Sequence, residues 1–177
     1  MNVNGVPDDW RHEKRISFGD IQRKLNGATL PERNVILEFV RSNSNRIRPP
    51  LDDDWLFDTM SHYFLDCVAR QTASTPDDSS VHTPFEAAHE LVGWFNWIVA
   101  RNDNRTAIQH RIERIAAAFR NGSRVVQNCL ETGFLEHVLE TPRNRPYFAH
   151  WKDDELLADS YTEALRWGEA HTKPNAP

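Results

Sequence analysis

Three side chains with metal-binding chemistry follow one another at intervals of four residues: Asp58, His62 and Asp66. Residues four apart lie on the same face of a helix, so two carboxylates and an imidazole could hold a metal ion between two turns. Such a ladder is more often a solvated helix face, on which the carboxylates flank the imidazole. Because the sequence names no fourth ligand, we favour the solvated face and keep the metal site as the weaker alternative.

Glu86 and His89 are spaced by three residues, which is half of the di-iron carboxylate pattern of some helical bundles. No second Glu-x-x-His occurs in the sequence, and both residues lie opposite the apolar arc of their predicted helix. Thr83, Pro84 and Glu86 instead match a capping box with proline at the first helical position. We therefore expect Glu86 to cap this helix and His89 to lie on its polar face.

Arg105 and His110 fit the Arg-x4–6-His motif of the HEPN family of helical ribonucleases. The motif is short, and a chain of 177 residues that contains eight histidines and many arginines matches it roughly twice by chance. Three further pairs fit as well, namely Arg143 with His150, Arg145 with His150, and Arg166 with His171. A ribonuclease that uses Arg105 and His110 therefore stays an alternative.

A basic and aromatic segment, RNRPYFAHW, covers residues 143–151. Arginine, tyrosine and tryptophan are the residue types that most often anchor protein interfaces. Large aromatic side chains also dominate cores, so the segment could instead fold its rings inward. The side chains that we predict to bind a partner are Arg143, Arg145, Tyr147, Phe148 and Trp151.

The elements that must position these residues are predicted to be helices. Apolar residues recur at helical spacing, and no run of alternating β-branched residues predicts a strand. The fold class is therefore all-α, as an irregular bundle of about six helices or a HEAT-like stack. The length suits one domain, so we expect a loose N-terminal arm over 1–16, a helical domain over 17–171 and a polar tail over 172–177. The clearest predicted helices cover 17–25, 30–43, 51–73, 83–100, 106–122 and 153–170.

The stretch SRVVQNCLETGFLEHVLE, residues 123–140, carries two apolar faces that nearly oppose each other on an ideal helix, with the change at Thr132 and Gly133. Either one continuous helix packs on two sides at different heights, or a kink at Gly133 separates two short helices. We favour the continuous helix because the stretch lacks proline. Gly133 is then a close-approach point for another helix, and Asn128 and Glu136 hold neighbouring segments by hydrogen bonds.

The same stretch carries the pattern V-x-N-x5-F-L-E, which resembles a signature of uncharacterised bacterial all-helical proteins. Some of those proteins look like immunity proteins encoded beside polymorphic toxins. The resemblance covers a short part of the chain and carries over no catalytic residue. It implies a helical protein that binds a cognate toxin. The residues of this structural motif are Val126, Asn128, Gly133, Phe134, Leu135 and Glu136.

Composition excludes several classes of function. The net charge of −5 argues against broad binding to nucleic-acid phosphates, and no apolar run is long enough to predict a membrane span. Cys67 and Cys129 fall in apolar stretches, where we expect buried free thiols and hence a cytoplasmic protein. The sequence contains no glycine-rich phosphate loop, and we expect no cofactor.

We therefore predict a non-catalytic, cytoplasmic binding protein with a protein partner. Its most specific form is an immunity-like protein that occludes a cognate toxin, with an acidic surface to steer a basic partner. The alternatives are the HEPN-like ribonuclease and a scaffold subunit of a larger assembly.

Overall fold

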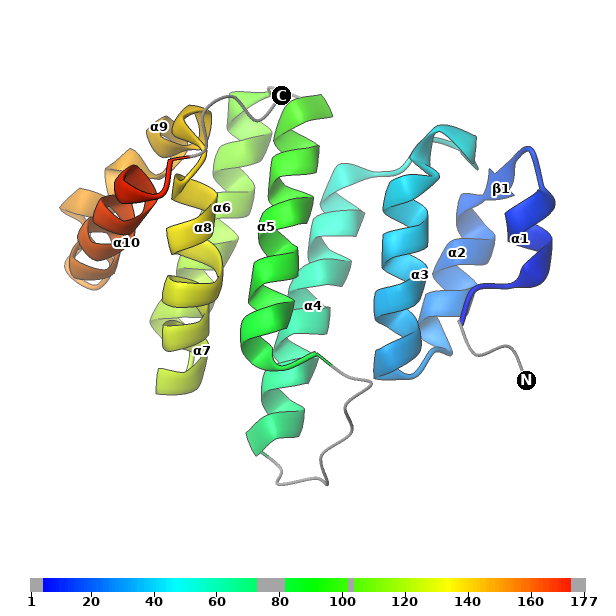
Figure 1. Cartoon of the computed structure of the whole chain (residues 1–177), viewed down its shortest axis with the longest axis horizontal. Helices are drawn as coiled ribbons and strands as arrows, with labels where there is room; N and C mark the ends of the chain where they lie inside the picture. Colours follow the sequence, from blue (N-terminus) through cyan, green and yellow to red (C-terminus); the bar gives the residue numbers. More distant parts are fainter. Residues whose placement is uncertain (1–4, 73–81, 102–103, 173–177) are drawn as a thin grey trace.

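The computed structural model describes residues 5–72, 82–101 and 104–172, which are almost wholly helical (Figure 1). This confirms the predicted all-α class. A two-residue parallel bridge joins β1 (Ile16–Ser17) to β2 (Ile47–Arg48). The α-helices are α1 (Asp8–His12), α2 (Phe18–Asn26), α3 (Leu30–Ser42), α4 (Asp53–Thr72), α5 (Pro84–Arg101), α6 (Arg105–Asn121), α7 (Arg124–Cys129), α8 (Glu136–Leu139), α9 (Arg145–Phe148) and α10 (Ala158–Ala170).

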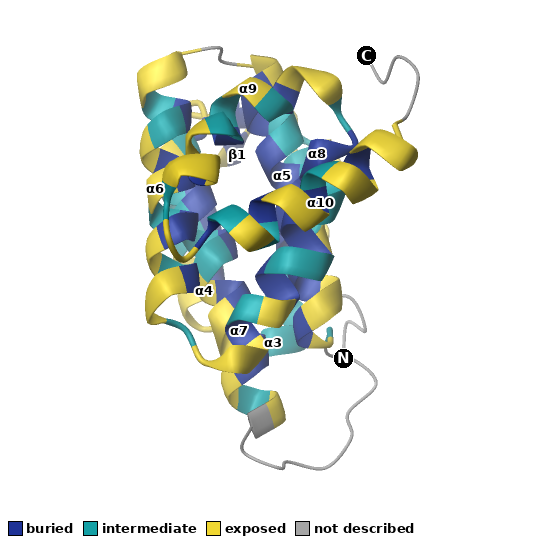
Figure 2. Ribbon diagram, turned by 90° about the vertical axis from the view of Figure 1, so that its left-hand side faces the viewer, coloured by how far each residue is buried: buried dark blue, intermediate teal, exposed yellow. Residues whose placement is uncertain are grey.

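The helices stand in a row, with α1 and α2 at one end and α10 at the other (Figure 1). In both ribbon views α5 and α8 lie in one layer, and α4 and α6 lie in the layer behind it (Figures 1 and 2). Two ion pairs join α4 to α6: the Arg111 guanidinium lies 2.9 Å from the Asp54 carboxylate, and Arg114 pairs with Asp58. This irregular two-layer row positions the site described below.

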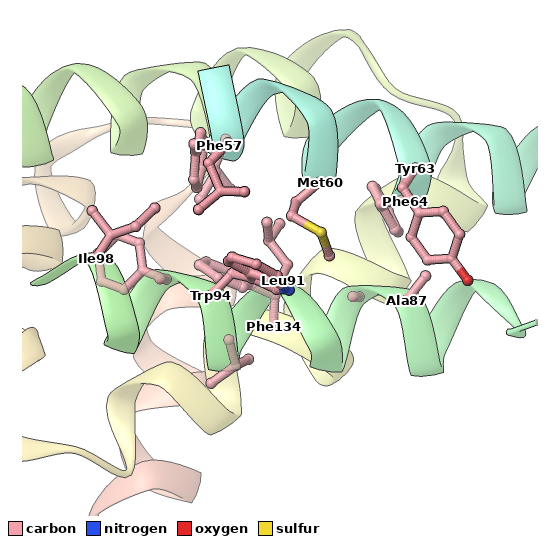
Figure 3. Packing of buried hydrophobic residues seen from close by; sticks show 14 of the residues in the cluster. Phe57, Met60, Tyr63, Phe64, Ala87, Leu91, Trp94, Ile98 and Phe134 are labelled. Carbon is pink, nitrogen blue, oxygen red and sulfur yellow. The ribbon is translucent and has the colours of Figure 1, made fainter. Parts of the chain in front are cut away.

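The core is densest between α4 and α5, whose apolar faces meet along their length (Figure 3). Phe57, Met60 and Phe64 from α4 face Leu91 and Trp94 from α5, and all five side chains are at most 2% exposed. Such aromatic side chains bury large apolar areas, which is the main favourable contribution to folding.

Side-chain caps explain where the main helices begin. Asp52 accepts hydrogen bonds from the backbone N–H groups of Asp54 and Trp55 at 2.8 and 2.9 Å and so caps the start of α4. The predicted capping box of α5 is confirmed, because the Glu86 carboxylate accepts the Thr83 backbone N–H at 2.7 Å and the Thr83 hydroxyl accepts the Glu86 N–H at 3.2 Å.

The prediction of a loose arm over residues 1–16 is wrong for residues 5–16. Val6, Trp10 and Ile16 are at most 6% exposed, and the Trp10 ring stacks on Phe39 with centroids 6.1 Å apart. The segment is mostly polar, so the sequence did not indicate that its three widely spaced apolar residues would be buried. Residues 1–4 and most of the predicted tail lie outside the described residues, as do residues 73–81 between α4 and α5.

Across the part of the chain that the structure describes, no helix combines the length and the apolar character that crossing a membrane requires.

Candidate functional site

Residues 124–139 form one continuous helical run, as predicted, but the run changes its geometry in the middle. The helix α7 leads into a π-helical turn, Leu130–Leu135, which continues directly into α8. A π-turn accommodates one extra residue and so rotates the following side chains by about 100° relative to a regular α-helix. This rotation accounts for much of the change of apolar face at Thr132 and Gly133 that the sequence displays.

Gly133, in the π-turn, is the predicted point of close approach. A Cβ atom at this position would lie 2.9 Å from the Cβ atom of Ala88 and 3.0 Å from the carbonyl oxygen of Phe85. The absence of a side chain therefore lets the π-turn rest directly on the first turns of α5. This contact brings the polar face of α5 beside α8.

The polar face of α5 and the adjoining face of α8 enclose a groove, which we call the histidine groove. Glu86, His89, Glu90 and Gly93 follow the i, i+3, i+4, i+7 spacing that places residues on one face of a helix. Two hollows of about 480 and 290 Å³ adjoin along this face and share His89, Glu90 and His137. The other described residues that line the groove are Arg41 from α3, His82 before α5, Phe85, Val92 and Asn96 from α5, Thr132 and Gly133 from the π-turn, and Glu140 and Thr141 after α8.

The two imidazoles at the centre of the groove contact each other. The ring centroids of His89 and His137 lie 4.6 Å apart with an interplanar angle of 83°. The Nδ1 atom of His137 lies 2.7 Å from a carboxylate oxygen of Glu140, which is only 6% exposed. This contact fixes the orientation of the His137 ring and leaves its Nε2 atom for another partner.

Arg41 supplies the cation of the groove. Its guanidinium lies 3.6 Å from the Glu90 carboxylate, and its Cζ atom lies 5.6 Å from the centroid of the Trp94 ring. The smaller hollow is lined by this guanidinium and by the carboxylates of Glu90 and Glu140. The larger hollow is lined by the carboxylates of Glu86 and Glu90, and no lysine or arginine of the described residues lines it.

Burial and hydrogen bonds set the protonation of neighbouring groups. The backbone N–H and the hydroxyl of Thr83 hold the pKa of Glu86 below its usual range, so this rim carboxylate is ionised at neutral pH. Burial raises the pKa of the Cys67 thiol to about 11 and also raises the pKa of Cys129. Both cysteines are buried free thiols, as predicted, and neither has the low pKa of a nucleophile.

The structure does not assemble a metal site from Asp58, His62 and Asp66. Asp58 pairs with Arg114, and an oxygen of Asp66 lies 2.7 Å from the Arg33 guanidinium. The described residues contain no group of three or more histidine, cysteine or acidic side chains that could hold a metal ion. In this structure arginines from adjacent helices pair with the two carboxylates on which the metal alternative depends.

Arg105 and His110, the alternative ribonuclease pair, are not brought together. Both side chains are exposed on α6, and five residues of helix separate them by about 140° around its axis. The Arg105 guanidinium instead lies over the Tyr147 ring, 6.0 Å from its centroid.

The predicted partner-binding segment, 143–151, is largely structural. Phe148 and Trp151 are 0% and 1% exposed and pack in the core, so their prediction as partner-binding side chains is wrong. Arg145 donates to the carbonyl oxygen of Leu139 at 2.9 Å and to the hydroxyl of Thr172 at 2.6 Å. Of the five side chains predicted to bind a partner, Arg143 is exposed and Tyr147 is half-buried. Short helical turns, which the sequence did not indicate, direct these rings inward.

The motif residues divide by burial. Val126, Phe134 and Leu135 are buried with Gly133, whereas Asn128 is exposed. Glu136 is half-buried, and burial raises its pKa. Neither the Asn128 nor the Glu136 side chain forms one of the hydrogen bonds found among the described residues, so the predicted hydrogen-bonding role is not seen.

Comparison with protein-family models, with curated proteins and with solved structures finds no match to this chain. The assignment of the histidine groove as a functional site therefore rests on the geometry of its residues alone. The sequence placed Glu86 and His89 on the polar face of α5, but nothing in it joined them to His137 and Glu140. The one available signal was Gly133, whose close approach to another helix was predicted without naming that helix.

Proposed function

We propose that this protein is a non-catalytic binding protein and that its histidine groove receives a basic segment of a protein partner. The observation that carries the proposal is the pair of carboxylates, from Glu86 and Glu90, that line the larger hollow of the groove. Phe85, which is 42% exposed at the groove, offers an apolar contact beside the charges. Aromatic contacts next to complementary charges are typical of interface anchors.

A second feature supports a basic partner. Residues 153–170 contain six carboxylates and one arginine, so their net charge of −5 equals that of the whole chain. Most of this segment is α10, whose outer face is exposed at one end of the row (Figure 2). Concentrated charge of one sign steers oppositely charged partners and raises the rate of association.

The most specific form of the proposal is an immunity-like protein of the cytoplasm that occludes a cognate toxin. Its support is the V-x-N-x5-F-L-E pattern together with an anionic groove suited to a basic protein. A scaffold subunit would use the same groove for a permanent partner. The ribonuclease alternative has less support, because Arg105 and His110 point in different directions and the groove would repel RNA phosphates.

Co-expression with the neighbouring reading frame tests the proposal. We expect the neighbouring product alone to arrest growth, and co-expression of this protein to restore it through a stable complex. The variant Glu90→Lys, which reverses a charge where the two hollows meet, should weaken the complex at least tenfold. Glu13→Lys makes the same change of charge in the exposed residue after α1, and it should leave the complex intact.

Each result has a clear meaning if the variants keep their melting temperatures. Equal binding by Glu90→Lys and the unchanged protein would exclude the groove as the docking site. Growth arrest that this protein does not relieve would exclude the immunity-like form, and loss of RNA in a His110-dependent manner would favour the ribonuclease.

A further inference from the structure

The histidine groove already holds one guanidinium, that of the protein's own Arg41. A Cβ atom on Gly93 would lie 2.8 Å from the Arg41 Nη1 atom, so the bare backbone of α5 provides the space that this group occupies. The guanidinium lies beside the Glu90 carboxylate and near the Trp94 ring. At this end the groove thus combines a carboxylate with an aromatic ring around a planar cation.

The larger hollow, of about 480 Å³, repeats these chemical features on the other side of Glu90. Its walls carry the rings of His89, His137 and Phe85 and the carboxylates of Glu86 and Glu90. Planar rings stack favourably on a guanidinium, and carboxylates accept its paired N–H groups. A lysine ammonium is a compact, strongly hydrated charge that gains less from flat ring surfaces.

We propose that the larger hollow of the histidine groove binds an arginine side chain of the partner, with its guanidinium beside Glu90 and against the rings of His89 and His137. The protein nature of the partner rests on the function proposed above, whereas the arginine specificity rests on the walls of this hollow. Arg41 competes electrostatically for the same Glu90 carboxylate and limits the affinity of the second guanidinium.

The charged and titratable groups that face the hollow or adjoin it are Arg41 from α3, His82, Glu86, His89 and Glu90 from α5 and the segment before it, and His137 and Glu140 from α8 and the residue after it.

Titration with N-acetyl-arginine amide, followed by nuclear magnetic resonance, tests the inference. We expect saturable shifts of the His89 and His137 ring signals at pH 8, with a Kd of about 1 mM, as befits a small solvent-exposed ligand. N-acetyl-lysine amide should bind at least fivefold more weakly. Glu90→Gln should reduce arginine binding at least fivefold, and Glu13→Gln should leave it unchanged. Arg41→Ala, which removes the competing cation, should tighten it two- to fivefold.

Equal binding of the two amides, or arginine-induced shifts that bypass His89 and His137, would overturn the arginine site. The two proposals fail separately. If Glu90→Lys weakens the complex with the partner but the two amides bind equally, only the arginine site is contradicted. If the protein binds arginine specifically but Glu90→Lys leaves the complex with the partner intact, only the proposed docking function is contradicted.

Discussion

Gly133 and Ala88 meet where the π-turn crosses α5, so closely that a Cβ atom on the glycine would lie 2.9 Å from that of the alanine. Gly133 also lines the larger hollow of the histidine groove. The close approach of the π-turn to α5 in the core therefore adjoins the site on the surface.

Enlarging Gly133 should destabilise the protein. Gly133→Ala introduces a methyl group against Ala88 and the Phe85 backbone, and overpacking of this kind costs about 1–3 kcal/mol even after the better helix propensity of alanine. Gly133→Leu should cost more. The control is Gly27→Ala, because the nearest atom to a Cβ there is 4.0 Å away. Thermal unfolding measures each variant, and an unchanged melting temperature for Gly133→Leu would show that the contact is open.

Asn144 should be intolerant of a change as small as Asn144→Asp. Its side chain is 0% exposed, and its amide nitrogen donates to the Val138 carbonyl oxygen at 3.0 Å and to the Asn96 side-chain oxygen at 2.6 Å. A carboxylate would place acceptor against acceptor in a buried site, which costs about 2–4 kcal/mol. Asn128→Asp makes the same chemical change on the exposed face of α7 and should shift the free energy of unfolding by less than about 0.5 kcal/mol. Similar losses in the two variants would contradict this account.

The sequence predicted the long helices well because their signals are local. The capping box at Thr83 lies within one turn of the groups that it binds, so spacing alone identified it. It failed at residues 5–16, where the burial of Trp10 depends on Phe39 and on Arg46, which donates to the Trp10 carbonyl oxygen at 2.5 Å. Those partners are distant in sequence, and no local pattern predicts their contact with Trp10.

The site was less predictable for the same reason. His89 and His137 are 48 positions apart, and their contact depends on the π-turn, which shifts the helical register in the middle of an otherwise regular pattern. The prediction for the aromatic segment at 143–151 failed for a different reason. Its residue types suit an interface and a core equally, and only the short turns around Arg145 decide that Phe148 points inward.

Alanine substitutions at Arg145 and Arg143 should differ in their effect on stability, because the first side chain bonds to helix ends and the second is exposed. Arg145 caps two helix ends, because it donates to the Leu139 carbonyl oxygen of α8 at 2.9 Å and to the Gly168 carbonyl oxygen of α10 at 3.2 Å. Arg145→Ala should lower the free energy of unfolding by about 1–2 kcal/mol through the loss of these bonds. Arg143→Ala, at an exposed position, should change it by less than about 0.5 kcal/mol. Urea titration measures both, and equal stability of the two variants would contradict a structural role for Arg145.

Glu136→Gln should stabilise the protein at neutral pH. Burial, together with the nearby Glu131 and Glu140 carboxylates, raises the pKa of Glu136, although His137 and His171 partly offset this. A carboxyl group whose pKa is higher in the folded state binds its proton more tightly there. Its contribution to stability is therefore fully present below the unfolded pKa and is lost as the pH rises through the folded value.

The neutral glutamine avoids that loss, so Glu136→Gln should raise the melting temperature at pH 7 by about 1–2 °C, which corresponds to roughly half a kcal/mol. Below pH 4, where the glutamate is protonated in both states, the two proteins should melt together. Glu169→Gln is the matched control on the exposed face of α10, and it should show no such pH-dependent gain. A melting temperature of Glu136→Gln that is lower at pH 7 and unchanged at pH 4 would mean that the ionised carboxylate stabilises the fold, contrary to the effect of its burial.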